Sequence, residues 1–113
     1  MPTKEIDSQE GTHATEADNG RIYADFSHSF TDAWEKKDIE FTFRFGKPNK
    51  MVIKQMQKTA ARDSAQASRN LLVNIIHPDD KAEFLTAAEE YPGLVTSFAT
   101  AVIKAVGIGE VGN

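Results

Sequence analysis

The sequence predicts an α+β fold that is mostly α, with a short N-terminal β element followed by about four helices in a compact bundle. Three features of the chain indicate this. Aromatic and aliphatic residues alternate with polar ones over residues 39–45, which is typical of a strand with one buried face. From Pro48 onward the apolar residues recur every three or four positions, which is typical of helices. Proline and glycine at 78, 92 and 93 divide this helical stretch.

The 113 residues give room for one domain. Residues 1–20 are acidic and polar and are predicted to form a disordered tail, residues 21–106 a single α+β domain, and the glycine-rich residues 107–113 a flexible end. No stretch approaches the roughly 20 apolar residues of a membrane span, and no signal-peptide core is present, so a cytoplasmic protein is expected. The chain has no cysteine, which excludes disulfides, thiolate metal sites and cysteine nucleophiles.

The strand over Ile39–Phe45 needs a partner, because a single strand is not stable. The partner is expected upstream, either at Arg21–Phe26 or around Trp34, and a second copy of the chain could also supply it. The competing interpretation is a short helix over Asp25–Lys37, followed by a turn at residues 36–38. This helix, with Phe26, Phe30, Ala33 and Trp34 on one face, is slightly favoured.

Four helices are predicted after Pro48. The first contains Met51–Ala60 with Asn49 as its N-cap, and the second covers Ser64–His77 and ends before Pro78. The third begins at Pro78, with Asp79 and Asp80 suited to its N-terminus. The last runs over residues 94–106 and is the most apolar. It is expected to be the central core helix or, alternatively, to expose part of its surface to a partner.

No arrangement of residues points to catalysis. His13, His28 and His77 lack the spacing of helical metal ligands. The carboxylate pairs Asp79/Asp80 and Glu89/Glu90 fall at a helix start and a helix end, where solvated positions are expected rather than acid–base pockets. The sequence therefore predicts no catalytic residue, no metal site, no cofactor and no enzymatic activity.

A basic segment occupies the middle of an otherwise acidic chain. Residues 44–78 carry seven Lys or Arg against one Asp, while the chain as a whole has a net charge of −4. Basic residues recur every three or four positions on the first helix: Lys47, Lys50, Lys54, Lys58 and Arg62. Three interpretations stay open, of which a solvated helix face is favoured. The others are contact with nucleic-acid phosphates and contact with an acidic protein or a neighbouring copy.

Three segments of the chain carry a family resemblance. They are FTFRFGKP at residues 41–48, RNLLVNIIHPDD at 69–80 and EFLTAAEEYPGLVTSFATAVIKAVG at 83–107. The run from Phe41 to Ala105 resembles the small tail assembly chaperones of tailed bacteriophages and prophages, and it covers about 65 of the 113 residues. The shared motifs belong to packing and turns, not to chemistry.

The resemblance implies a non-enzymatic protein of the host cell cytoplasm that is absent from the mature virion. Such chaperones bind the tape measure protein, a long helical chain, and help recruit the major tail protein. No catalytic residue carries over. From the apolar and basic patterns we expect partner contacts at Val95, Phe98 and Val102 on the last helix, with an electrostatic rim at Lys50, Lys54 and Lys58. The alternative is a small nucleic-acid-binding or regulatory protein that uses the basic stripe over Lys47–Arg62.

Overall fold

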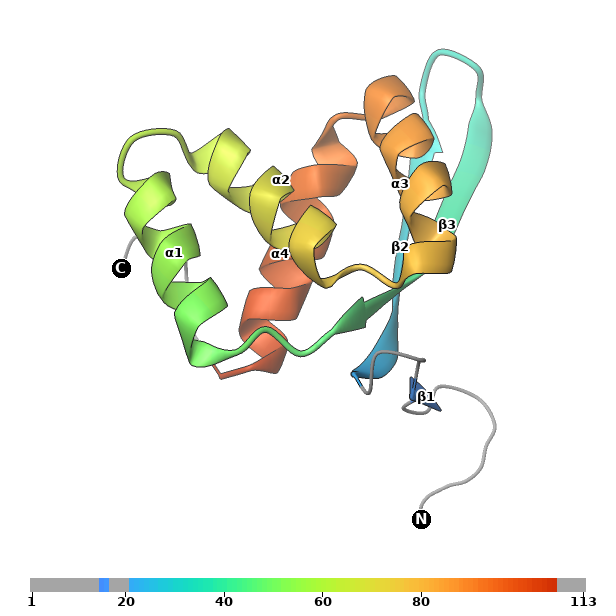
Figure 1. Ribbon diagram of the computed structural model, residues 1–113. Helices are drawn as coiled ribbons and strands as arrows, with labels where there is room; N and C mark the ends of the chain where they lie inside the picture. The colour runs from blue at the N-terminus through green and yellow to red at the C-terminus, as the bar shows by residue number, and fades with distance from the viewer. Residues whose placement is uncertain (1–14, 17–20, 108–113) are drawn as a thin grey trace.

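A computed structural model describes residues 15–16 and 21–107 of the chain (Figure 1). The predicted α+β, mostly α fold is confirmed, with the strands first and four helices after them. The predicted tail 1–20 and end 107–113 lie outside the described residues, apart from Thr15–Glu16 and Gly107. The elements are β1 (Thr15–Glu16), β2 (Ile22–Asp32), β3 (Lys37–Gly46), α1 (Lys50–Ala60), α2 (Ser64–Ile75), α3 (Pro78–Glu90) and α4 (Gly93–Ala105).

The predicted helix over Asp25–Lys37 is wrong, because this segment forms most of strand β2 and the turn after it. β2 pairs with β3 in an antiparallel hairpin whose register runs from Tyr23↔Gly46 to Asp32↔Lys37. The turn occupies residues 33–36 rather than 36–38. The helical interpretation placed Trp34 on a buried face, whereas its side chain is 91% exposed.

The hairpin has one apolar and one polar face, since residues paired directly across two antiparallel strands share a face. Phe26 lies opposite Phe43 and Phe30 lies opposite Ile39, which places aromatic and aliphatic side chains on the same side. Hydrogen bonds join polar pairs on the other face, for example Ser27 Oγ with Thr42 Oγ1 at 2.8 Å. The sequence pattern of residues 22–32 alone does not distinguish a strand from a helix. Pairing with β3, which supplies the other half of the apolar face, selects the strand.

The four helices cover the apolar face of the hairpin in successive layers (Figure 1). α4 packs directly on β2, α2 packs on α4, and α1 packs on α2. Phe98 of α4 forms the centre of this packing, with its ring 5.5 Å from that of Phe43 and 5.6 Å from that of Phe45. The last helix is thus a core helix, with five fully buried residues: Leu94, Phe98, Ala99, Val102 and Ile103.

Local signals set the helix ends. Asn49 caps α1, because its side chain accepts a hydrogen bond from the Val52 amide at 2.8 Å, as predicted. Pro78 begins α3, also as predicted. α2 ends at Ile75, two residues earlier than expected, because Ile76 is extended and bridges to Phe45 of β3. None of the helices within the described residues has both the length and the apolar character needed to cross a membrane.

Candidate functional site

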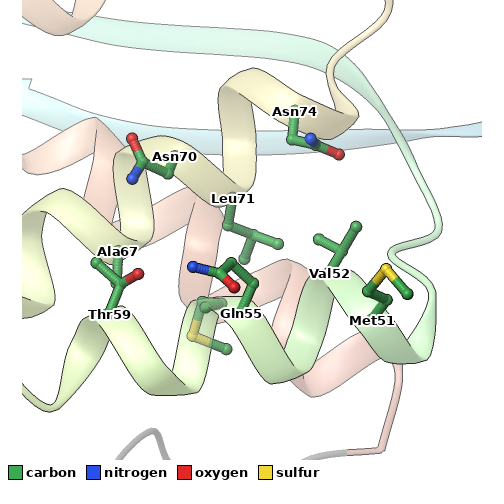
Figure 2. Close-up of a pocket in the computed structure, with 9 residues that line it drawn as sticks. Met51, Val52, Gln55, Thr59, Ala67, Asn70, Leu71 and Asn74 are labelled. Carbon is green, nitrogen blue, oxygen red and sulfur yellow. The ribbon is translucent and has the colours of Figure 1, made fainter.

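The most promising site for a partner is an open groove between α1 and α2, which we call the α1–α2 groove. Its volume is about 330 Å³, and Figure 2 shows side chains of the two helices facing each other across it. The groove is lined by Met51, Val52, Gln55, Met56 and Thr59 of α1, and by Ala67, Asn70, Leu71 and Asn74 of α2. Residues three or four apart lie on the same side of a helix, so Met51, Gln55 and Thr59 form one row of α1 and Val52 and Met56 form the row beside it.

The groove has an apolar floor and polar rims. Met56, Ala67 and Leu71 are buried and form part of the hydrophobic core. Asn70 and Asn74 are exposed on the α2 side, and Gln55 is exposed on the α1 side. Met51 stands at the open end with 77% of its surface exposed. An apolar floor between amide rims, with a flexible methionine at the edge, suits the apolar side of a helix from another chain.

A row of three lysines runs along α1 beside the groove. Lys50, Lys54 and Lys58 each directly precede a groove residue in the sequence, so the two rows run parallel, about 100° apart around the helix. All three lysines are exposed. Within residues 15–16 and 21–107 none of their ammonium groups makes an ion pair or side-chain hydrogen bond, which leaves one side of the groove electropositive.

The groove was not predicted from the sequence, although the sequence contains a signal for it. Met51 is apolar, like Val52, Met56 and Ala60 of the same helix. The latter three follow a strict four-residue spacing, and Met51 lies about 100° away from Val52 on the helix. An apolar side chain that lies beside the lysine row, and not on the buried face of the helix, indicates a surface for contact with a partner. The contribution of Asn70 and Asn74 could not be foreseen, because it depends on how α2 crosses α1.

The structure places the three candidate residues of the last helix in or against the core. Phe98 and Val102 are each 1% exposed, and Val95 is half-buried and packs on the core cluster. In the folded chain, the side chains of Phe98 and Val102 are therefore enclosed by other residues and present no surface to a partner. α1, which carries the lysine row, packs mainly on α2, and α2 in turn packs on α4.

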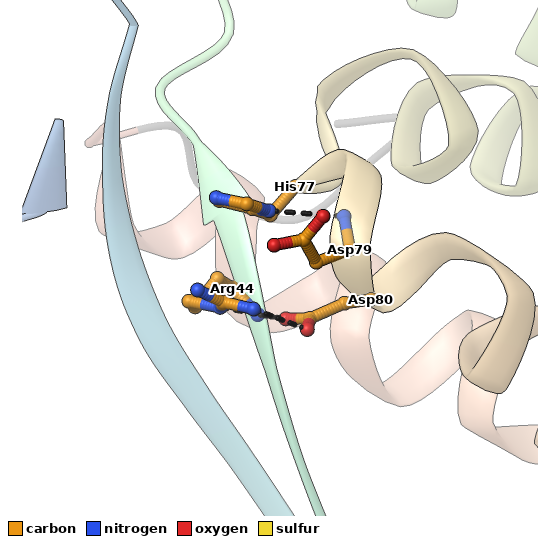
Figure 3. A network of polar contacts seen from close by, with 4 residues as sticks. All are labelled: Arg44, His77, Asp79 and Asp80. Atoms are coloured by element: carbon orange, nitrogen blue, oxygen red, sulfur yellow. Dashed lines mark hydrogen bonds and ion pairs between the residues drawn. The ribbon is translucent and has the colours of Figure 1, made fainter. Parts of the chain in front are cut away.

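A polar network joins α3 to the hairpin (Figure 3). The Arg44 guanidinium donates to both oxygens of Asp80, at 3.0 Å to Oδ2 and 2.7 Å to Oδ1, and the Arg44 amide also donates to Oδ2 at 2.8 Å. These donors hold the pKa of Asp80 below its ordinary value and raise the pKa of Arg44. Asp80 was expected to be solvated, but its side chain is 14% exposed. The pair anchors the first turn of α3.

His77 serves this same junction. Its Nδ1 accepts a hydrogen bond from the Asp79 amide at 3.0 Å, and its ring lies 4.7 Å from that of Tyr23. The histidine thereby caps α3 in the place where Ser or Asp commonly does so. His28 lies on the hairpin between the rings of Phe30 and Phe98, and His13 is outside the described residues. The part of the chain that the structure describes holds no group of three or more His, Cys, Asp or Glu residues able to bind a metal.

Comparison with known proteins places this architecture in a family. Residues 20–113 match DUF6848, a domain of unknown function, and the chain belongs to this family. The structure is similar to that of an uncharacterised protein, rbstp2171, from Bacillus stearothermophilus, with a TM-score of 0.63 and 27% sequence identity. The similarity covers 79% of this chain and 86% of that one. No curated protein matches the sequence.

Proposed function

We propose that this chain is a phage or prophage tail assembly chaperone that binds the tape measure protein through the α1–α2 groove and acts without catalysis. The resemblance of residues 41–105 to that family supports the class of protein. The observation that carries the binding mode is the groove itself, which combines an apolar floor, the exposed Met51 and the row of Lys50, Lys54 and Lys58.

The groove favours one kind of ligand. An amphipathic helix from the tape measure protein would lay its apolar side over Val52 and Leu71 and turn acidic residues toward the lysines. A long helical chain that exposes apolar surface before assembly aggregates unless that surface is covered. The proposed protein covers such segments in the host cytoplasm, helps recruit major tail protein and leaves before the virion is complete.

Co-expression tests the proposal. If a very long helical reading frame lies directly downstream of this gene, its product is the tape measure candidate. We expect it to be soluble and to copurify with the wild-type chain. Its solubility and its copurification should both be lost with Met51→Asp, which places a carboxylate at the mouth of the groove. Thr100→Asp is the matched control, because Thr100 is exposed on α4 and outside the groove. A tape measure protein that stays insoluble with or without the wild-type chain would overturn the proposal.

The second candidate is a small nucleic-acid-binding or regulatory protein, favoured by the lysine row, which makes no ion pair with any residue that the structure describes. Each lysine–phosphate contact would add affinity that falls with salt concentration. A mobility-shift titration with duplex DNA separates the two: a shift that weakens steeply with salt supports this candidate, and the absence of a shift supports the chaperone.

A further inference from the structure

The outer edge of strand β2, on the side away from β3, is open over most of its length. β1 covers this edge only at Ile22 and Tyr23. Over residues 24–32, no other part of the described chain donates to or accepts from the backbone on that side. An open strand edge is a row of unpaired amide and carbonyl groups, and such a row is a template for another strand.

Four residues direct their backbone groups to this edge. Arg44 of β3 points its own backbone groups away from β2, because its amide donates to Asp80 and its carbonyl accepts from the His77 amide. Arg44 lies opposite Asp25, so these two do not bond to each other through the backbone, and bonding and non-bonding pairs alternate along the hairpin. The residues that turn both an amide and a carbonyl to the open edge are therefore Asp25, Ser27, Ser29 and Thr31.

This edge lacks the features by which strand edges commonly avoid association. Residues 24–31 contain no lysine, arginine or proline, and their pairing with β3 continues without a bulge. The outer edge of β3 is different, because charged Asp38 and Glu40 alternate along it and α3 closes its end at Arg44. Of the two edges of the hairpin, that of β2 is the one suited to the addition of a strand.

We propose that this edge binds the same edge of a second copy, so that the two β2 strands pair antiparallel around a two-fold axis at His28. Asp25 then lies opposite the partner's Thr31, and Ser27 lies opposite the partner's Ser29. Because both pairs are centred on residue 28, all four outward residues of each chain form bonding pairs in this one register. The interface is isologous, as a closed dimer requires.

Side chains match on both faces of the sheet in this register. Phe26 lies opposite the partner's Phe30 on the apolar face, where both rings pack on the core cluster and are half-buried. His28, which packs on Phe98, faces the partner's His28 on the axis. Hydroxyl groups and the Asp25 carboxylate meet on the polar face, and no two acidic side chains lie opposite each other.

A second β2 suits the edge better than the chain upstream of β1 does. Continued in the register of Thr15↔Tyr23, that upstream sequence would place polar residues 8, 10 and 12 opposite the ring-bearing residues 30, 28 and 26. β1 leaves room for the partner, because the partner's Asp32 lies opposite Ala24, next to the Tyr23 that β1 covers. The interface does not use the α1–α2 groove, so the inference does not rest on the proposed function.

Disulfide trapping tests the register, because the chain has no cysteine of its own. His28→Cys should give a disulfide-linked dimer under mild oxidation, since a non-bonding antiparallel pair brings its Cα atoms to about 4.5 Å, within the range that a disulfide spans. Ser29→Cys is the matched control, because it is more exposed but lies opposite residue 27 of the partner. It should crosslink only when it is mixed with the Ser27→Cys chain.

Sedimentation velocity over a concentration series measures the association itself. We expect the wild-type mass to rise from one chain to two with increasing concentration. Ser29→Pro removes an amide from the β2 edge and should weaken dimerisation at least about tenfold, because the two-fold axis doubles the loss. Glu40→Pro is the matched control, since Glu40 lies opposite Ser29 and turns its amide to the outer edge of β3. It should leave dimerisation unchanged.

Circular dichroism verifies that each variant is folded. A wild-type chain that stays monomeric throughout the concentration series would overturn the inference. So would a Ser29→Pro variant that dimerises like the wild type, or a Ser29→Cys chain that crosslinks as readily alone as with Ser27→Cys.

Discussion

Tyr91, at the end of α3, donates its hydroxyl proton to Oδ2 of Asp32, which closes β2, across 59 residues of sequence and a distance of 2.9 Å. The same carboxylate holds the hairpin turn through its other oxygen. The hydrogen bonds lower the pKa of Asp32, and the bond to Asp32 raises the pKa of Tyr91 to about 12. One carboxylate therefore connects the hairpin tip to the helical layer.

Tyr91→Phe should loosen the tip without unfolding the protein. The variant lacks the hydroxyl but keeps the ring that packs on Phe30. We expect faster hydrogen exchange at the amides of Trp34 and Glu35 and a lower Tm. Because the folded-state pKa of Tyr91 is raised above the ordinary 10.0, the stabilisation is complete below pH 10 and is lost as the pH rises toward 12. A Tm difference between wild type and variant that persists unchanged above this range would contradict the assignment.

Asp80→Asn should destabilise the protein by about 2 kcal/mol, because it removes the charge that pairs with the half-buried Arg44 guanidinium. The folded-state pKa of Asp80 is lowered, so the stabilisation is present above its unfolded value of 3.8 and is lost as the pH falls below it. Urea unfolding at neutral and acidic pH measures this. Asp79→Asn is the control: it removes an exposed charge from the same helix start and should cost under about 0.5 kcal/mol.

Phe98→Ala should cost about 3–5 kcal/mol of unfolding free energy, because the ring is enclosed by aromatic neighbours from the hairpin and α3. Val95→Ala, on the same helix but half-buried, should cost about 1 kcal/mol. Thermal or urea unfolding distinguishes them. If Phe98→Ala were fully stable yet defective in partner binding, Phe98 would be a surface contact and its central place in the packing would be wrong.

Two glycines should respond oppositely to alanine. At Gly46 a Cβ would lie 2.9 Å from Cγ of Arg21, whose guanidinium donates to the Asn74 carbonyl at 3.0 Å. Gly46→Ala should therefore displace Arg21 and cost about 1 kcal/mol. At Gly93, the first residue of α4, a Cβ meets nothing within 4 Å, and alanine should stabilise by up to about 1 kcal/mol. Equal Tm values for both variants would contradict this account.

Reversal of the lysine row tests the electrostatic part of the groove. The triple variant Lys50→Glu, Lys54→Glu and Lys58→Glu should weaken binding of the proposed helical partner about tenfold, since three exposed ion pairs contribute on the order of 0.2–1 kcal/mol each. The wild-type affinity should fall with salt and the variant affinity should not. The control reverses Lys81 and Lys104, two exposed lysines on α3 and α4. Binding that is equally weakened by both sets would remove the lysine row from the site.

The sequence by itself determined the elements whose signals are local. Asn49 reaches an amide three residues away, and Pro78 acts through its own ring, so both helix starts were predictable. The strand over residues 39–45 was also predictable, because its alternation admits no helical face. The lysine row and the core role of the last helix both follow from the spacing of residues. The last helix also has more apolar residues than a single exposed stripe would need.

Only the tertiary structure decided the rest. Residues 22–32 fit either a helix or a strand until pairing with β3 selected the strand. Arg44 and Asp80 are 36 residues apart and meet because Ile76 and His77 run beside β3, where Ile76 bridges to Phe45 and the His77 amide donates to the Arg44 carbonyl. The groove exists because α2 crosses α1 at a particular place, and Trp34 is exposed because the turn falls there. These features depend on contacts between distant segments, whose free energy no local pattern encodes.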